Sequence, residues 1–482
     1  MSHNTPFFPQ FRYLCGRPSQ SQAQLLARQF KHIRECSLSQ LESLFEGIIP
    51  HTLLTKARRG ANSRERIFGP RVTFWAFLGQ VLRRERCRGA VRLVQARRQM
   101  LGQAEISADT SAYCRARLRL CMKILQGIGE RVVAYLRRLC PPGNLWKGRE
   151  VLVVDGTSAS MADTPANQLE FPQSGGQKRG CGFPVVQLVG LFCLASGALT
   201  KFARTEIKVH ELAVFVLELL EELKRGQILL GDRAFGTYAC LALLIERGVD
   251  GVFRLHQARR VVGAEIKIIG LEDRRVRWSK SKQRPVYLGA EEYAQLPSTL
   301  LLRQIRFRIE QPGFRSQEIV LITTLLDEEA YTAEDLMELY LRRWAVELSF
   351  RDIKTTLGMD ILSGQSPAIV EREITMHLIG YNLLRTLMLE ASISHQTPLH
   401  RLSFKGSLDT VRHWSEVIDR VRDKPRLRQQ AIDEMLFIIA SDQLPHRPYR
   451  SEPRAVKRRP KGYQLMNRPR NEMEISPSRK LK

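Results

Sequence analysis

The stretch Val151-Leu152-Val153-Val154-Asp155-Gly156-Thr157-Ser158 is an apolar run that ends on a carboxylate. The run predicts a buried β-strand, and an ionised Asp at its end is costly unless something compensates its charge. A second run, 228–230, ends in the same way within Gly231-Asp232-Arg233-Ala234-Phe235. Two strand ends that carry Asp155 and Asp232 therefore predict a polar site built on a sheet.

Short apolar segments alternate with amphipathic ones along the middle of the chain. The expected strands are 151–154, 184–194, 199–206, 228–230 and 252–255, and the expected helices are 210–223 and 238–247. This alternation favours a mixed sheet with helices packed on it. The predicted fold class is therefore α/β.

The two flanks and one internal segment differ from this pattern. Residues 1–145 predict a basic helical region, with apolar positions at helical spacing in 25–45 and 72–82. A β-rich insertion is expected at 257–325, with strands at 261–262, 266–269, 276–278, 286–288, 301–309 and 318–325. Helices at 333–357 and 369–389 follow. The predicted divisions are 1–145, 146–256, 257–325, 326–395 and 396–482, the last with helices and a basic tail.

The charge of the chain favours a polyanionic partner, with nucleic acid first. The formal net charge is +27 over 482 residues. Between Lys56 and Arg98 there are thirteen basic residues and only two acidic ones, and 447–482 holds twelve basic and three acidic residues. A solvated surface usually mixes both signs, so we interpret the arginine-rich helices as a DNA contact rather than as an ordinary charged face.

The cysteines and the apolar segments exclude other classes of protein. Nine cysteines, an odd number with no Cys-x-x-Cys spacing, disfavour a disulfide framework or a zinc site and fit a reducing interior. The longest apolar stretch, 185–199, is interrupted by polar and glycine residues. It is shorter than the ~20 residues of a membrane span, so we expect a buried strand and no membrane partner. The amino terminus does not resemble a signal peptide.

A third carboxylate, Glu347, lies in a helical pattern with Tyr340, Arg343 and Lys354. At roughly 100° per residue these four positions fall within about 60° of one another on a continuous helix. An ion-paired surface stripe is the simpler interpretation, because Arg343 and Glu347 are four residues apart. The apolar Leu341, Trp344 and Leu348 favour instead a helix that packs on the sheet beside the two Asp residues.

Three carboxylates in these settings suit divalent metal ions. Mg²⁺ takes oxygen ligands and usually only one or two protein carboxylates, and paired ions can activate an attacking oxygen and stabilise a leaving one. Asp155 would bridge the ions, while Asp232 and Glu347 would each hold one. Lys354 would neutralise a phosphate, and Arg343 with Tyr340 would hold another phosphate or orient Glu347. The alternative for Asp155 and Asp232 is the capping of turns. Glu211 opens a helix, where a carboxylate stabilises the helix dipole.

The combined motifs resemble those of bacterial insertion-sequence DDE transposases, the IS-four-type family with the Tyr-Arg-Glu-Lys signature. Tyr340, Arg343, Glu347 and Lys354 meet the spacing Tyr-x-x-Arg-x-x-x-Glu-x-x-x-x-x-x-Lys in full. The segments around Asp155 and Asp232 match the two aspartate motifs, and 70–78, 107–117 and 456–461 resemble other parts of the family.

The resemblance implies a ribonuclease-H-like catalytic core with a β-rich insertion. It also implies a homodimer that binds terminal inverted repeats and cuts and pastes DNA, through a hairpin in some relatives, in the bacterial cytoplasm near the nucleoid. Asp155, Asp232 and Glu347 would bind two Mg²⁺ ions, for which Mn²⁺ can substitute. Arg233 would contact DNA, and Trp278 in the insertion would stack on a flipped base.

Two other functions remain open at this point. A ribonuclease-H-like nuclease would cut without joining, and a DNA-binding protein with an inactive site would do neither. The intact trio of Asp155, Asp232 and Glu347 argues against the second, because a binding protein has no need of it.

Overall fold

A computed structural model describes residues 2–5, 8–14, 40–55, 59–60, 63–100, 102–255, 264–309, 317–445, 466–469 and 472. One ten-stranded sheet dominates the described residues, in the order β5-β4-β3-β6-β7-β11-β10-β9-β8, with β12 beside β3. Its strands are β3 (Val151–Met161), β4 (Val185–Cys193), β5 (Leu199–Glu206), β6 (Ile228–Gly231), β7 (Asp250–Arg254), β8 (Ala264–Gly270), β9 (Asp273–Ser279), β10 (Thr299–Ile309), β11 (Gln317–Thr323) and β12 (Ile361–Leu362).

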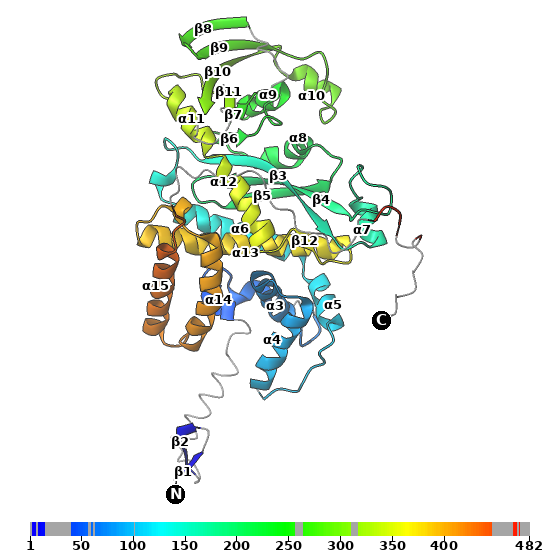
Figure 1. Ribbon diagram of the computed structural model, residues 1–482, viewed down its shortest axis with the longest axis vertical. Coiled ribbons are helices and arrows are strands. Elements are labelled where there is room, and N and C mark those ends of the chain that lie inside the picture. Colours follow the sequence, from blue (N-terminus) through cyan, green and yellow to red (C-terminus); the bar gives the residue numbers. More distant parts are fainter. Residues whose placement is uncertain are drawn as a thin grey trace, which may run out of the picture.

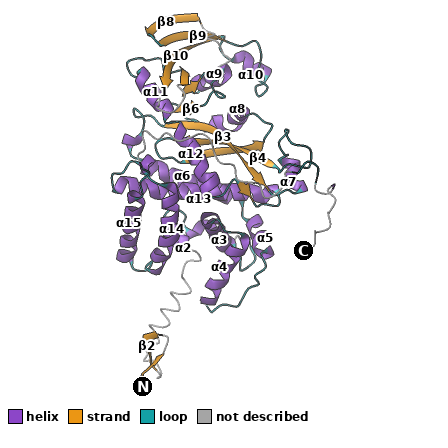
Figure 2. Cartoon of the chain, in the orientation of Figure 1, coloured by secondary structure: helices purple, strands orange, loops and turns teal. Residues whose placement is uncertain are grey.

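The strand directions divide this sheet into two parts. β3, β4 and β5 are antiparallel neighbours, while β3, β6 and β7 run parallel. The strands β8 to β11 are antiparallel and join the sheet where β11 pairs with β7. The β-rich insertion therefore continues the central sheet rather than forming a separate one, as Figures 1 and 2 show at the top of the molecule.

Burial explains why the parallel strands form. The first four residues of β3 and all four residues of β6 are buried, as expected for strands covered on both faces. β3 is longer than the predicted 151–154, because its polar second half still pairs with β4, with Ala159 opposite Val186. The parallel register places Val153 opposite Leu230. β6 ends one residue later at Gly231, whereas β3 continues to Met161, so Asp155 lies within β3 and not at its end as predicted.

The long helix α13 (Pro367–Ser394) packs against the sheet, the helix α6 and the helix α3. Its buried residues lie on all sides of the axis, which marks a central helix of a large core. The other helices are α2 (Gln40–Phe45), α3 (Pro70–Arg83), α4 (Cys87–Met100), α5 (Ser111–Arg119), α6 (Met122–Leu139), α7 (Pro165–Glu170), α8 (Glu211–Val214), α9 (Tyr238–Glu246), α10 (Ala290–Gln295), α11 (Ala333–Leu341), α12 (Trp344–Arg351), α14 (Phe404–Arg420) and α15 (Pro425–Ser441).

Several sequence predictions need correction. The expected strand 286–288 is a turn, closed by the Leu288 N–H to Pro285 carbonyl bond of 3.2 Å, and it leads into the unpredicted helix α10. The expected helix 210–223 is α-helical only at α8, and then continues as a π-turn and a 3-10 turn. The expected strand 261–262 and most of the segment 25–45 lie outside the described residues.

Smaller features complete the fold. A two-stranded hairpin joins β1 (Ser2–Thr5) and β2 (Phe8–Leu14) near the amino terminus. Short 3-10 turns lie at His51–Leu54, Pro142–Asn144 and Leu399–Arg401. Over the described part of the chain, no helix is long and apolar enough to cross a membrane.

Candidate active site at the ends of two parallel strands

Asp155 and Asp232 lie side by side at one edge of the sheet. Val153 of β3 is paired with Leu230 of the parallel strand β6. Asp155 lies two residues after Val153, and Asp232 lies two residues after Leu230. Adjacent strands are ~4.8 Å apart, so the two carboxyl groups belong to the same small region. The sequence prediction that both strand ends build one site is consistent with this register.

The negative charge of the Asp155 carboxylate is poorly compensated by its surroundings. Burial raises the pKa of Asp155 to about 6, and Asp232 and Glu211 add to the rise, although the Gly156 N–H and Arg343 oppose it. One oxygen, Oδ1, accepts a 2.9 Å hydrogen bond from the backbone N–H of Gly156. A carboxylate in this state favours a nearby cation.

Asp232 combines a structural contact with its place at the site. Its Oδ1 accepts a 2.8 Å hydrogen bond from the Ala234 N–H, which is the turn-capping contact considered as an alternative. Phe235 then anchors the turn, because it is fully buried and its ring meets that of Phe215 edge-on at 5.9 Å. The cap orients Asp232 at the end of β6.

Arg343 connects the helical carboxylate to the strand ends. Its Nη2 donates a 3.1 Å bond to Glu347 Oε1, with side chains that are 9% and 43% exposed. Burial alone would lower the pKa of Arg343, but Tyr340, Asp155 and Glu347 outweigh it and raise the pKa. The buried Nε of Arg343 has no hydrogen-bond partner within the described residues, so its N–H can still donate to a ligand.

The predicted continuous helix 333–357 is wrong, but part of the helical face derived from it is kept. α11 ends at Leu341, a turn at Arg342 and Arg343 follows, and α12 ends in a π-turn at Asp352–Thr356 that contains Lys354. No glycine or proline marks this break in the sequence. Tyr340, Arg343 and Glu347 stay neighbours across the turn, and Arg343 lies 5.8 Å from the centre of the Tyr340 ring.

α12 does pack on the sheet, but through other residues than predicted. Leu341, Trp344 and Leu348 are exposed. The buried side chains are Val346 and Phe350, and the Phe350 ring meets that of Phe192 on β4 edge-on at 4.9 Å. The apolar face formed by Val346 and Phe350 thus points to the sheet, while Glu347 on the same helix is partly exposed.

The remaining predicted residues lie in three different environments. Arg233 is exposed beside Asp232, and Lys354 is half-buried. Trp278 is only 6% exposed and belongs to the hydrophobic core where β9 crosses the insertion. A base could stack on Trp278 only if this packing opened.

The donor set fits Mg²⁺ by its chemistry, since Asp155, Asp232 and Glu347 offer hard oxygen ligands. The uncompensated, buried carboxyl of Asp155 supports this fit. As arranged in the described ranges, no three His, Cys, Asp or Glu side chains are close enough together to hold an ion. Glu347, which is paired with Arg343, would have to turn toward the two strand ends.

Sequence reasoning missed a fourth carboxylate at this edge, Glu211 of α8. An ideal Cβ built on Gly156 would lie 2.0 Å from Glu211 Oε1. The sequence predicted only that Glu211 stabilises a helix dipole, and not that its carboxylate approaches β3. The only sequence signal is a glycine directly after the strand-end Asp, which is weak on its own.

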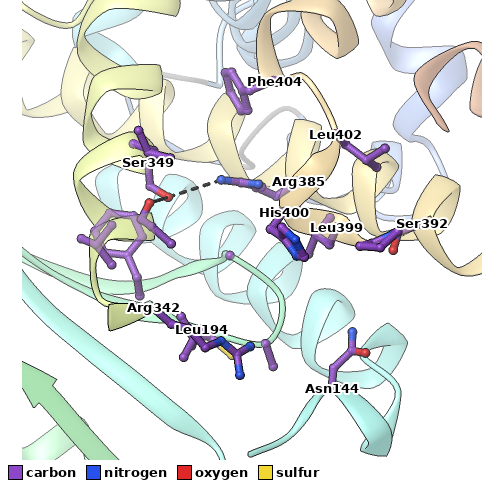
Figure 3. A pocket seen from close by; sticks show the side chains of 18 of the residues that line it. Asn144, Leu194, Arg342, Ser349, Arg385, Ser392, Leu399, His400, Leu402 and Phe404 are labelled. Atoms are coloured by element: carbon purple, nitrogen blue, oxygen red, sulfur yellow. Dashed lines mark hydrogen bonds between the residues drawn. The ribbon is translucent and has the colours of Figure 1, made fainter. Parts of the chain in front are cut away.

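A prominent cavity of the structure does not contain these residues. It measures about 920 Å³ and lies between α12, the β4–β5 turn and the residues that follow α13. Ala345, Leu348 and Ser349 line it from α12, and Arg385 Nη2 donates a 3.3 Å bond to Ser349 Oγ, as Figure 3 shows. Asp155, Asp232 and Glu347 are absent from its lining.

This arrangement defines a class of protein: a mixed α/β domain, consistent with the ribonuclease-H-like domain of transposases, with acidic residues at two parallel strand ends and on a helix packed against them. The family model of the transposase DDE domain matches residues 146–383. Together with the relatives described next, this match supports an IS4-type DDE transposase.

Known proteins extend this assignment beyond the domain. The chain is 27% identical over 363 residues to the transposase InsG for insertion sequence element IS4 of Escherichia coli K12, covering 73% of this chain and 77% of that protein. It is also 29% identical over 96 residues to the putative transposase InsL for insertion sequence element IS186A and to the transposase for insertion sequence element IS421, both of Escherichia coli. These shorter matches cover 19% of this chain and 26% of each relative.

Proposed function

We propose that this protein binds the terminal inverted repeats of its insertion sequence and catalyses DNA cleavage and strand transfer with a ribonuclease-H-like core. The observation that carries the proposal is the register that brings Asp155 and Asp232 to one sheet edge, with the carboxyl of Asp155 uncompensated. The names of the similar proteins support transposition as the overall activity.

Each residue has a role that follows from its position. Asp155, Asp232 and Glu347 would hold two Mg²⁺ ions, or Mn²⁺ in their place. When bound, these ions would activate the attacking oxygen and stabilise the leaving oxygen of a phosphodiester. Arg343, with an unpartnered Nε, would hold a phosphate oxygen and release Glu347 for the metal.

Further basic residues would position the DNA around this site. Lys354 would neutralise a phosphate near the cleaved bond, and Arg233 is exposed beside Asp232 for a similar contact. In the amino-terminal region, Arg84, Arg86, Arg88 and Arg92 are all exposed, as a phosphate-binding surface requires. Two copies of the chain would act together in a synaptic complex on the bacterial nucleoid.

The decisive experiment combines linear DNA that carries the terminal repeats, a supercoiled target plasmid and Mg²⁺. We expect cleaved ends and joined products. Asp155→Ala, Asp232→Ala and Glu347→Ala should each abolish cleavage but retain end binding, while Glu338→Ala, an exposed carboxylate of α11, should leave both unchanged. Cleavage without joined product would favour the nuclease alternative, and near-normal turnover of any of the three variants would remove that residue from the metal site.

A further inference from the structure

Glu211 approaches the backbone of β3 so closely at position 156 that a side chain there would clash with its carboxylate. The hypothetical Cβ of Gly156 would lie 2.0 Å from Oε1, 2.2 Å from Cδ and 2.7 Å from Oε2 of Glu211. Real Cβ atoms do not come this close to other heavy atoms, so Gly156 is required for the carboxylate to reach the strand. The residue directly after Asp155 thus makes room for a second acidic side chain.

Two neighbouring residues fix Glu211 in this place. His210 is the N-cap of α8, and its Nδ1 accepts a 3.2 Å bond from the Leu212 N–H. Gln187 of β4 donates a 2.9 Å bond from Nε2 to Glu211 Oε1. A carboxylate that served only the helix dipole would need neither Gln187 nor the approach to Gly156.

The carboxyl groups of Asp155 and Glu211 flank the same glycine. Asp155 Oδ1 is 2.9 Å from the Gly156 nitrogen, and Glu211 lies against the Gly156 Cα. With standard backbone bond lengths, these contacts place the two carboxylates within about 8 Å of one another. One hydrated divalent cation can bridge groups at such a separation.

The charge of this region also calls for a cation. Asp232 and Glu211 both lie near enough to Asp155 to act on its charge, and Arg343, which opposes them there, is ion-paired with Glu347. Arg343 is more than nine-tenths buried and its Nε has no partner in the described ranges, so this side chain also points to a ligand at the site.

We propose that Glu211 is a fourth acidic residue of the metal site and acts with Asp155 on the divalent cation. This inference rests on the proposed function, because it assumes that Asp155 binds metal. In this arrangement Gly156 and Gln187 are positioning residues that hold the Glu211 carboxylate.

The test measures Mn²⁺ binding to the full-length protein by isothermal titration calorimetry, a readout that does not depend on activity. We expect Glu211→Gln to weaken Mn²⁺ binding by about 10- to 100-fold, as for other supporting residues of metal sites. Glu218→Gln is the matched control, because Glu218 is an exposed carboxylate of the same helical segment and the charge change is identical.

A second variant tests the geometry. Gly156→Ala should displace Glu211 and weaken Mn²⁺ binding to a similar extent, and the double variant Gly156→Ala/Glu211→Gln should be little worse than either single one. Additive losses would overturn the proposed contact. Thermal melts establish that each variant folds, and if Glu211→Gln does not, Glu211→Asp is measured instead with an intermediate loss expected.

Asp155→Asn separates this inference from the proposed function. If Asp155→Asn retains wild-type Mn²⁺ affinity, the metal site itself is misassigned. If Asp155→Asn loses Mn²⁺ binding while Glu211→Gln retains it, the role of Glu211 alone is overturned.

Discussion

At the scale of single residues, Asp155 is an unfavourable group at the proposed site. It follows the buried first four residues of β3, and burial raises its pKa to about 6. Within the fold its principal partners are a backbone N–H and the nearby Arg343. Such groups are common at functional sites, because stability is given up there for reactivity.

The Asp155→Asn variant should therefore be more stable than the wild type without metal. The pKa rises from 3.8 to about 6 on folding, so the folded protein binds the proton more tightly. The charged form thus destabilises the fold above pH 6, and this cost disappears as the pH falls below 4. We expect Asp155→Asn to gain about 1–3 kcal/mol at pH 8 in EDTA. Urea unfolding of both proteins at pH 8 and pH 4 measures this gain in stability.

The matched control for this prediction is Asp163→Asn, an exposed carboxyl just after β3. It should leave stability unchanged at both pH values. A destabilised Asp155→Asn at pH 8 would mean that the carboxylate is well compensated after all, and would weaken the argument for a cation.

Substitutions of Trp278 distinguish a role in core packing from a role in stacking on a DNA base. Because it is only 6% exposed within the core, Trp278→Ala should destabilise the protein by about 3–5 kcal/mol. Trp278→Phe keeps most of the buried ring and should cleave transposon ends normally. Urea unfolding and end cleavage measure the two effects, with Trp414→Phe on α14 as control. A folded Trp278→Phe protein that loses cleavage tenfold or more would restore the stacking role.

At the scale of elements, the helix α4 packs in the core through one face and carries on another face the arginines that we propose contact DNA. Val91 and Val94 pack into the small core of the amino-terminal region, whereas Arg88 and Arg92 are exposed one turn apart. Such a helix can bind phosphates without disturbing its own packing.

The double variant Arg88→Ala/Arg92→Ala should reduce the salt dependence of end binding. Each lost phosphate contact lowers the slope of log K against log salt by about 0.9, so a decrease of about 1.8 is expected. Fluorescence anisotropy at several salt concentrations measures this slope. The control Arg420→Ala/Arg426→Ala removes two exposed arginines from α14 and α15. It should leave the slope of log K against log salt unchanged. Equal slopes for both double variants would exclude α4 as the contact.

The sequence predicts elements well where burial is continuous along the chain. The strand β6 and the helix α3 agree closely with the expected ranges, because their buried residues follow one another without a gap. The strand β5 also agrees, although only Leu199 and Ala203 of it are buried. The segment 286–288 has strand-forming residues, but Pro285 restricts the backbone before it and a turn results.

The site was less predictable, because its geometry depends on contacts between distant segments. The residue types Asp155, Asp232 and Glu347 follow from strand ends and spacing. The break at Arg343 has no local signal, and the approach of Glu211 to Gly156 depends on how α8 meets β3. Tertiary packing decides both.

At the scale of the whole molecule, α13 connects the sheet to α12, the helix that carries Glu347. Asn382 accepts a 2.9 Å bond from the Leu199 N–H and donates one of 2.9 Å to the Leu199 carbonyl, which fixes the β4–β5 edge. One turn further, Arg385 donates 3.0 Å and 3.3 Å bonds to Tyr381 Oη and Ser349 Oγ. The position of α12 is thereby tied to the same helix that supports the sheet.

The hydrophobic core is continuous across this connection. It includes Phe74 of α3, Val153 of β3, Leu383 of α13 and Met435 of α15 in one cluster. We therefore expect the amino-terminal helices, the sheet and the carboxy-terminal helices to unfold together rather than as separate units.

Asn382→Ala tests this coupling. The change leaves the buried N–H and carbonyl of Leu199 without partners, which costs about 1–3 kcal/mol for each group. Because the core is shared, the loss should lower the stability of α3 and of β4 alike, as hydrogen exchange of the two segments measures at increasing urea. The control Gln396→Ala, at an exposed position after α13, should change neither. If exchange of β4 accelerates while that of α3 keeps its wild-type free energy, the sheet and the amino-terminal helices are independent units, and α13 does not transmit stability between them.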